Sequence, residues 1–305
     1  MTTDPLQAAY DAACAYPHTN PDMFKESALI RIDSGEIIMN EALKRTLIEN
    51  AALSKRLTGT SLDLPTYNIR LNGSETRTLS DRIAILGFGA NCSAAVLLKK
   101  FKKAGAGGDC FLTQATLENH AIVHSAFVGA AGSIPATVIP ADGIHAHITV
   151  GFYTLEQAEA LTATEPNYDL VQKSGLILTR GIENNPVLNN GALMYVSIWG
   201  AFTEDGQTPS LQAGIPQTSP LMATPTSWAI ARAARITGYG DDTVKFVNAI
   251  KSGPENLHER LRHTFQMHPQ NALTASISGT KVKDAALYGQ TRDMAVPMLP
   301  RITYL

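Results

Sequence analysis

The chain has 305 residues but few cysteines, few charged residues and little excess of charge of either sign. Its three cysteines, Cys14, Cys92 and Cys110, are scattered and form no Cys-x-x-Cys pair, which excludes a disulfide framework or a zinc knuckle. Charged residues make up 17% of the chain, against a usual value of about 25%, and the formal net charge is −2. Because there is no basic excess, nucleic acid is not an expected partner, whereas a small-molecule substrate is.

The chain also lacks a long, uninterrupted apolar run. Residues 119–141 contain no Asp, Glu, Lys or Arg, but they include histidines, glycines and two prolines. A membrane-spanning helix needs about 20 mostly apolar residues, so we expect strands and turns here and no contact with a membrane. The first residues show no basic region followed by an apolar run, so no secretory signal is expected. Together with the odd number of cysteines, this favours a cytoplasmic protein and leaves homo-oligomerisation open.

Residues 1–80 are predicted to be an extension that packs on the core. A helix is expected after Asp4-Pro5, because an aspartate cap followed by proline is a typical helix start. A strand is expected over 28–32. Apolar residues recur at helical spacing over 36–57, which predicts an amphipathic helix, and Asn72-Gly73 predicts a hairpin turn.

Residues 81–205 have the pattern of a mixed α and β domain. A short buried strand at 83–86 leads into a glycine-rich loop and a helix capped by Ser93. Thr154 and Gln157 form a capping-box pattern, which starts a second helix that ends near residue 164. The remaining apolar runs between turn residues are predicted strands, at 111–115, 121–128, 136–139, 145–153, 168–171, 176–179 and 193–199.

Residues 206–305 are predicted to be a mostly helical C-terminal extension. Its helices are expected to begin near Pro225, Asp242 and Pro254. The expected fold class is therefore α+β, with helical segments added at both ends of a middle region that contains a sheet.

The first candidate site is the loop Gly87-Phe88-Gly89-Ala90-Asn91, which joins a strand to a helix. Two glycines allow a sharp turn and a close approach to a ligand, and a helix N-terminus attracts an anionic group such as a carboxylate. The loop lacks the ending of a phosphate-binding loop and the third glycine of a dinucleotide fingerprint. On spacing alone, a tight structural turn is the favoured interpretation.

The second candidate is Glu165. It stands where the predicted helix must end, because Pro166 disfavours helical backbone at the preceding residue. A carboxylate at the C-terminal end of a helix opposes the helix dipole, so Glu165 has no evident local structural use. A functional role and a solvated surface position are equally compatible with this segment.

The order of a strand, a Phe-Gly-Ala-Asn loop, a helix, several strands and a helix ending in Leu-x-x-x-Glu-x-x-Tyr resembles the gamma-glutamylcyclotransferase-like family. In that family a Tyr-Gly-Ser-Asn loop holds the substrate, and a later glutamate acts as acid/base. The resemblance covers about residues 82–200 and makes Glu165 the acid/base. The matching loop residues are Phe88, Gly89, Ala90 and Asn91. Phenylalanine and alanine replace the tyrosine and serine of the family, so two loop hydroxyls are absent.

The resemblance implies a small mixed β-barrel and an enzyme that needs neither metal nor cofactor. In the family, the α-amine of a γ-glutamyl compound attacks its own γ-carbonyl, which yields 5-oxoproline and a free amine. Glu165 would accept the amine proton and pass it to the leaving group, while backbone amides of the loop would hold a carboxylate or the oxyanion. The same groups would also serve a reaction on another small amide. Further candidate substrate-binding residues are Cys92, Tyr153 and Tyr168.

Three other functions remain open. The loss of the loop hydroxyls favours a non-catalytic module that binds a small molecule or a partner on the same fold. Cys92, close to a helix N-terminus, would act as the nucleophile of a thiol amidase with His124 or His147 as base. A hydrolase with a histidine-bound metal would use four residues, although no familiar ligand spacing is present: His120, His124, His145 and His147.

Two further features have an ordinary explanation. The one basic run is interpreted as a solvated helix face; it consists of Lys99, Lys100, Lys102 and Lys103. The segment from Ser133 to Thr137 is either an ordinary turn or part of a cleft wall.

Overall fold

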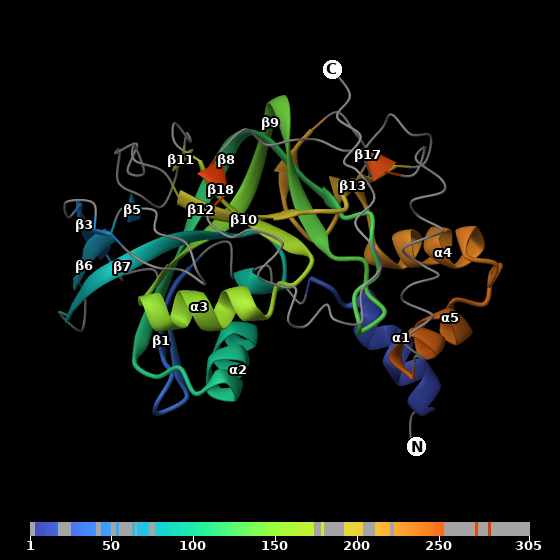
Figure 1. Ribbon diagram of the computed structural model, residues 1–305, viewed down its shortest axis with the longest axis horizontal. Helices are drawn as coiled ribbons and strands as arrows, with labels where there is room; N and C mark the ends of the chain where they lie inside the picture. Colours follow the sequence, from blue (N-terminus) through green and yellow to red (C-terminus); the bar gives the residue numbers. More distant parts are fainter. Residues whose placement is uncertain are drawn as a thin grey trace.

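The computed structural model of the protein describes residues 4–17, 26–40, 44–49, 53–54, 63–64, 66–72, 77–173, 178–179, 192–203, 211–219, 223–252, 272–273 and 280–281. These residues form a mixed α+β structure, in which five α-helices lie around one large mixed sheet (Figure 1). The predicted α+β class is confirmed. No helix in these ranges is long and apolar enough to cross a membrane.

The described helices are α1 (Pro5–Cys14), α2 (Ala94–Ala104), α3 (Leu155–Ala163), α4 (Thr226–Ile236) and α5 (Thr243–Lys251), with one short 3-10 turn, η2 (Ala90–Cys92). Fourteen described strands join the large sheet: β1 (Ser27–Arg31), β2 (Glu36–Asn40), β3 (Lys44–Glu49), β6 (Thr66–Asn72), β7 (Arg77–Gly87), β8 (Asp109–His124), β9 (Ala136–Tyr153), β10 (Tyr168–Lys173), β11 (Leu178–Thr179), β12 (Ala192–Ser197), β14 (Leu211–Gln212), β15 (Gln217–Thr218), β16 (Ala223–Thr224) and β18 (Thr280–Lys281). Two smaller sheets consist of β4 (Leu53–Ser54) with β5 (Asp63–Leu64), and β13 (Ala201–Phe202) with β17 (Ala272–Leu273).

The large sheet is built around the long antiparallel pair β8 and β9. Their register is interrupted once, between Glu118 and His120, where Asn119 has a φ of 55°. Strand β7 pairs antiparallel with β9 and parallel with β12, so it lies in the middle of the order β8-β9-β7-β12-β10. The four short strands predicted over 111–153 are therefore two long ones.

Strand register brings the end of β7 and the start of β10 to the same edge of the sheet. Strand β12 runs parallel to β7 and pairs Met194 with Leu86, so its last residue, Ser197, extends beyond the end of β7. Strand β10 is antiparallel to β12 and begins with Tyr168 opposite Ser197. The residues that follow β7 therefore lie close to the residues that precede β10.

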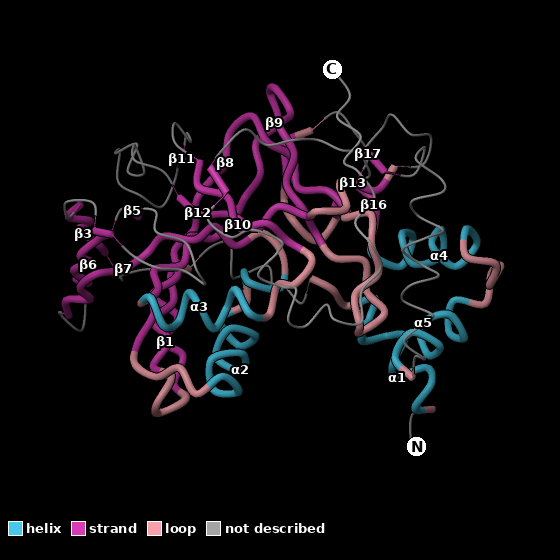
Figure 2. Tube along the Cα trace, in the orientation of Figure 1, coloured by secondary structure: helices cyan, strands magenta, loops and turns pink. Residues whose placement is uncertain are grey.

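Both faces of the sheet are buried along the second half of β7, from Arg82 to Gly87, which explains the apolar run over 83–86. Ile83 and Ile85 belong to a core cluster that includes the apolar sides of α2 and α3. Ala84 and Leu86 belong to the cluster on the other face. Figure 2 shows α2 and α3 together on one side of the sheet.

Helix α1, near the start of the chain, and helices α4 and α5, much later in the sequence, form a separate helical unit. Helices α1, α4 and α5 pack against one another at the opposite end of the molecule from α3 (Figure 1). Thr226, at the start of α4, links this helix to Tyr16, which follows α1, and to Gln212 of β14. Its hydroxyl donates to the carbonyl of Tyr16 at 2.8 Å and accepts from Gln212 Nε2 at 3.2 Å.

The amphipathic helix predicted over 36–57 is wrong, because β2, β3 and β4 occupy this stretch. The chain reverses at Gly35, whose φ of 77° favours glycine, and β2 then pairs with β1. β-branched residues such as Ile37 and Ile38 suit a strand at least as well as a helix. Apolar spacing alone did not distinguish the two structures, and pairing with β1 decided between them.

Several other predicted elements are confirmed. Strands β6 and β7 form the antiparallel pair of the predicted hairpin, whose turn residues 73–76 lie outside the described residues. Thr154 and Gln157 form both hydrogen bonds of a capping box at the start of α3. Backbone N–H groups donate to the predicted caps of α1, α2 and α5, which are Asp4, Ser93 and Asp242. The helix predicted from Pro254 lies outside the described residues.

The predicted segment boundaries near residues 80 and 205 do not coincide with breaks in the sheet. Strands β1 and β6 come from the predicted N-terminal extension, and β14 and β15 come from the predicted C-terminal extension. All four pair with strands of the large sheet, so both flanking segments contribute to the core.

Replacing Thr226 with valine should lower the free energy of unfolding by about 1–3 kcal/mol, because the carbonyl of Tyr16 and the amide of Gln212 each lose a partner. Urea denaturation measures this change. Thr237→Val is the matched control, since the Thr237 hydroxyl donates to carbonyls of its own helix; it should change stability by less than about 0.5 kcal/mol. Equal effects of the two variants would contradict a link between α4 and Tyr16.

Candidate functional site

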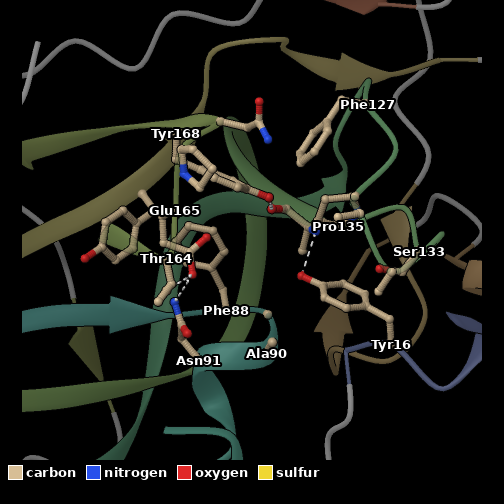
Figure 3. A pocket seen from close by; sticks show the side chains of 18 of the residues that line it. Tyr16, Phe88, Ala90, Asn91, Phe127, Ser133, Pro135, Thr164, Glu165 and Tyr168 are labelled. Atoms are coloured by element: carbon tan, nitrogen blue, oxygen red, sulfur yellow. Dashed lines mark hydrogen bonds between the residues drawn. The ribbon is translucent and has the colours of Figure 1, made fainter. Parts of the chain in front are cut away.

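A cavity of about 300 Å³ opens at the sheet edge where β7 ends and β10 begins. This volume is at the lower end of the range for small-molecule sites. Its wall includes Tyr16 after α1, the loop after β7, the connection between β8 and β9, the start of β9 and the turn between α3 and β10. Figure 3 shows side chains from these separate segments around one space.

Glu165 and Asn91 meet at the wall of this cavity, although 74 residues separate them in the sequence. Asn91 Nδ2 donates to Glu165 Oε1 at 3.1 Å (Figure 3). Lys100 Nζ donates to the same Oε1 at 2.7 Å and to Asn91 Oδ1 at 2.8 Å. The side chains of Lys100 and Glu165 are 21% and 15% exposed, so the ion pair is largely shielded from bulk solvent. We call these three side chains the charged cluster.

Local structure accounts for two members of the charged cluster. Asn91 lies in η2, where the N–H of Cys92 donates to the carbonyl of Gly89 and turns the chain from β7 into α2. Helix α3 ends at Ala163, and Glu165 follows in the tight turn that leads to β10. Glu165 is therefore a cavity residue and not a solvated surface glutamate.

Lys100, the third member, was not predicted, because the whole basic run was assigned to a solvated face. Lys99, Lys102 and Lys103 are exposed, but Lys100 is half-buried. It follows the buried Leu97 by three residues, which puts it at the edge of the buried stripe of α2. This offset from Leu97 is the sequence signal that would have separated Lys100 from Lys99 and Lys103.

Tyr16, also not predicted, covers the loop from the side of the terminal helices. A Cβ atom at position 89 would lie 2.5 Å from Tyr16 Oη, so Gly89 makes room for this phenol. The N-terminal segment thus supplies a hydroxyl next to a loop in which Phe88 and Ala90 have none. No feature of the sequence near Tyr16 indicated this role, since the contact depends on how the terminal helices pack.

Two tyrosine hydroxyls bind the backbone of one residue, Ala136. Tyr16 Oη accepts from the Ala136 N–H at 2.9 Å, and Tyr168 Oη donates to the Ala136 carbonyl at 2.9 Å (Figure 3). Burial raises the pKa of both phenols, and the charge of Glu165 is a smaller contribution in the same direction. Both hydroxyls therefore stay protonated near neutral pH and act as hydrogen-bonding groups.

Most of the predicted site residues line the cavity: Phe88, Gly89, Ala90, Asn91, Glu165 and Tyr168. The segment from Ser133 to Thr137, for which a turn and a cleft wall were both open, contributes Ser133, Pro135 and Ala136 to the wall. Of the residues predicted from the loop and its resemblance, the structure therefore brings those at Phe88–Asn91 together with Glu165 and Tyr168.

Cys92 and Tyr153 were predicted to bind substrate, but they lie in the core outside the cavity lining. The Cys92 thiol is fully buried and donates to the Gly87 carbonyl at 3.0 Å. Burial raises the pKa of this thiol to about 11, which opposes its use as a nucleophile. The ring of Tyr153 packs against Phe101 of α2, because its position in β9 directs it to the helix-covered face.

The four histidines are not gathered into one group. In the part of the chain that the structure describes, no set of three or more His, Cys, Asp or Glu side chains is arranged to hold a metal ion. His124 is fully buried, with Nε2 3.0 Å from the Thr224 carbonyl and Nδ1 3.4 Å from the Gln212 amide nitrogen. These partners hold the ring in the core, which argues against its acting as a base for Cys92.

Comparisons with known proteins find no counterpart. No protein-family model matches the chain, and neither does any curated protein or solved structure. The case for a function therefore depends on the residues of the cavity and their contacts.

Gly89→Ala should destabilise the protein by about 1–3 kcal/mol, because the new methyl group overlaps the Tyr16 hydroxyl. In a Tyr16→Phe background the nearest remaining ring atom lies 3.6 Å away, so the same substitution should cost at least about 1 kcal/mol less. Urea denaturation of the wild type, both single variants and the double variant measures this coupling. Strictly additive effects would show that Tyr16 does not occupy the space above Gly89.

Stability should fall with pH below about 6.5 in part through His124. Burial lowers the pKa of His124 from 6.5 to about 4, so between these values the unfolded chain binds a proton that the folded chain does not. The stabilising contribution is complete above pH 6.5 and is lost as the pH falls towards 4, by up to about 3 kcal/mol. His124→Gln should show a smaller loss of unfolding free energy over this range, and an unchanged pH dependence would contradict the assignment.

Proposed function

We propose that the protein is a cofactor-independent enzyme of the gamma-glutamylcyclotransferase type, which acts on a γ-glutamyl-like or other small amide with Glu165 as acid/base. The observation that carries the proposal is the contact of Glu165 with Asn91 of the Phe88–Asn91 loop at the wall of one cavity. The order β7, loop, α2, β8, β9, α3, Glu165, β10 supports the corresponding family fold for the middle of the chain.

The proposed reaction is an internal amide exchange. The α-amine of the substrate forms a bond to its own γ-carbonyl carbon, the original amide C–N bond breaks, and 5-oxoproline and an amine are released. An amine is largely protonated near neutral pH, so the attacking nitrogen loses one proton before attack and a second as the lactam forms, and the departing nitrogen gains two when it leaves as an ammonium ion. A single carboxylate in reach of both nitrogens, that of Glu165, accepts each proton from the attacking nitrogen in turn and donates it to the departing one.

The neighbours of Glu165 supply the remaining functions. Asn91 orients the carboxylate through its amide, and the ammonium group of Lys100 is placed to hold the carboxylate of the substrate. Backbone amides of the loop from Gly89 to Asn91 would stabilise the negative charge that develops on the γ-carbonyl oxygen. The Tyr16 and Tyr168 hydroxyls hold Ala136, so the wall opposite the loop is fixed before a ligand enters.

A second candidate is a module that binds a small amide without converting it. The absence of hydroxyl groups at Phe88 and Ala90 favours it, because the loop then offers only backbone groups and Asn91 to a ligand. Two features would have marked such a module: a Glu165 turned to solvent, or no cavity beside Asn91. The described residues show neither, and the enzyme is therefore the preferred proposal.

Glu165→Gln should lower kcat by at least about 100-fold, because the amide cannot accept and return a proton. The assay is release of 5-oxoproline and amine from a panel of γ-glutamyl amines and simple amides. Glu156→Gln, an exposed glutamate in the first turn of α3, is the matched control and should keep full activity.

The Glu165→Gln variant should still fold, because the glutamine amide oxygen can accept from Lys100 Nζ and Asn91 Nδ2, and losing the charge of this largely shielded ion pair should cost about 1–3 kcal/mol. Thermal unfolding of both glutamine variants checks this. A Glu165→Gln protein with full turnover would overturn the assignment of Glu165. A wild type that binds a γ-glutamyl amide but releases no product would favour the binding module.

A further inference from the structure

The charged groups of the cavity are concentrated at one place. Among the described residues that line it, the charged side chains are Lys100 and Glu165, which form an ion pair at 2.7 Å. Asn91 binds both of them. The reacting amine and carbonyl must reach Glu165, so this end of the cavity holds the γ-glutamyl head of the substrate.

The rest of the described wall is mainly aromatic and aliphatic, and its other polar side chains, those of Ser133, Thr164 and Asn167, carry no charge. Phe127 packs edge-on against Tyr168, with ring centroids 6.1 Å apart, and lies away from Asn91 in Figure 3. Pro135 and the exposed Ala130 of the β8–β9 connection extend this surface. The part of the substrate that extends beyond the γ-carbonyl must lie against these side chains.

The hydroxyl groups of Tyr168 and Tyr195, two of the tyrosines that line the cavity, are hydrogen-bonded to other protein groups. Tyr195 Oη is 2.9 Å from Thr162 Oγ1, and Tyr168 Oη donates to the Ala136 carbonyl. Both therefore contribute ring surface to the cavity.

We propose that the amine released from the amide is uncharged and apolar at the end remote from its nitrogen, as in an alkylamine or arylamine; this inference rests on the proposed function. A carboxylate or ammonium group at that end would lose its hydration on entering the cavity, and the described lining offers no opposite charge to compensate. Lys100 cannot pair with a carboxylate at that end without moving away from Glu165 and from the γ-glutamyl head of the substrate. An apolar chain instead gains free energy by covering Phe127, Pro135 and the tyrosine rings.

Three γ-glutamyl amides of equal reach test the proposal: those of pentylamine, 4-aminobutyrate and 1,4-diaminobutane. They differ at the far end, which is a methyl group, a carboxylate and an ammonium group. The kcat/KM of the wild type should be at least tenfold higher for the pentylamide than for either charged amide. Equal values, or a preference for a charged amide, would overturn the proposal.

A charge introduced at the cavity mouth should change this preference. Ala130→Lys adds an ammonium group at an exposed lining position, where no core packing is disturbed. It should raise kcat/KM for the 4-aminobutyrate amide at least fivefold relative to the pentylamide. Ala130→Gln, of similar length but uncharged, is the control and should leave the ratio unchanged. An unchanged ratio in the lysine variant would show that the far end of the substrate does not lie beside the β8–β9 connection.

A binding measurement separates failure of this proposal from failure of the proposed function. Isothermal titration calorimetry gives the Kd of each amide for Glu165→Gln, in which no product is expected to form, and for the wild type with any amide that it does not turn over. If no amide is turned over but the pentylamide binds at least tenfold more tightly than the charged amides, the proposed reaction is wrong and the apolar assignment stands. If amides are turned over and bound without preference, the reaction stands and the apolar assignment is wrong. If nothing binds, both are wrong.

Discussion

Strand β7 pairs with β9 along one edge and with β12 along the other, and in its second half the side chains on both faces are buried. A shift of register by one residue would exchange the two faces, so the point at which the chain leaves β7 at Gly87 is strongly determined. The loop and α2 follow directly, and α2 packs back onto the same sheet. The positions of Asn91 and Lys100 beside the cavity are therefore a consequence of core packing.

Local signals in the sequence were sufficient for the elements that depend on local contacts. The caps of α1, α2, α3 and α5 could be predicted because a cap side chain binds backbone within three residues of itself. The strands of the stretch 36–57 could not be predicted in this way, because β2, β3 and β4 pair with β1, β6 and β5, which are outside the stretch. The participation of both flanking segments in one sheet is equally non-local, so segment boundaries drawn from composition did not follow it.

In the candidate site too, some residues could be predicted from local sequence and others could not. Glu165 stands out in sequence because a glutamate at the C-terminal end of a helix has no evident local structural use. The Phe88–Asn91 loop predicts only a tight turn by its spacing, and its order relative to Glu165, which resembles the gamma-glutamylcyclotransferase-like family, singled it out. Lys100 differs from its neighbouring lysines only in its angular position on α2, which becomes informative once Leu97 is known to be buried. Tyr16 contacts a residue 120 positions away, and its place depends on the packing of α1 against α4 and α5. Such a contact leaves no local pattern.

In the proposed function, the ion pair of Lys100 with Glu165 would let a site with so little charge select a charged head group. A γ-glutamyl head carries an ammonium group and a carboxylate on the same carbon atom. In the proposed reaction its carboxylate takes the place of Glu165 beside Lys100, and its ammonium group takes the place of Lys100 beside Glu165. No charge is then left unpaired in a partly buried place. This exchange of partners would place the substrate amine, which must lose a proton, beside the Glu165 carboxylate, which accepts the proton. Recognition of this kind needs no net charge in the cavity, and the low charge of the chain, 17% of residues with a net −2, is no obstacle to it.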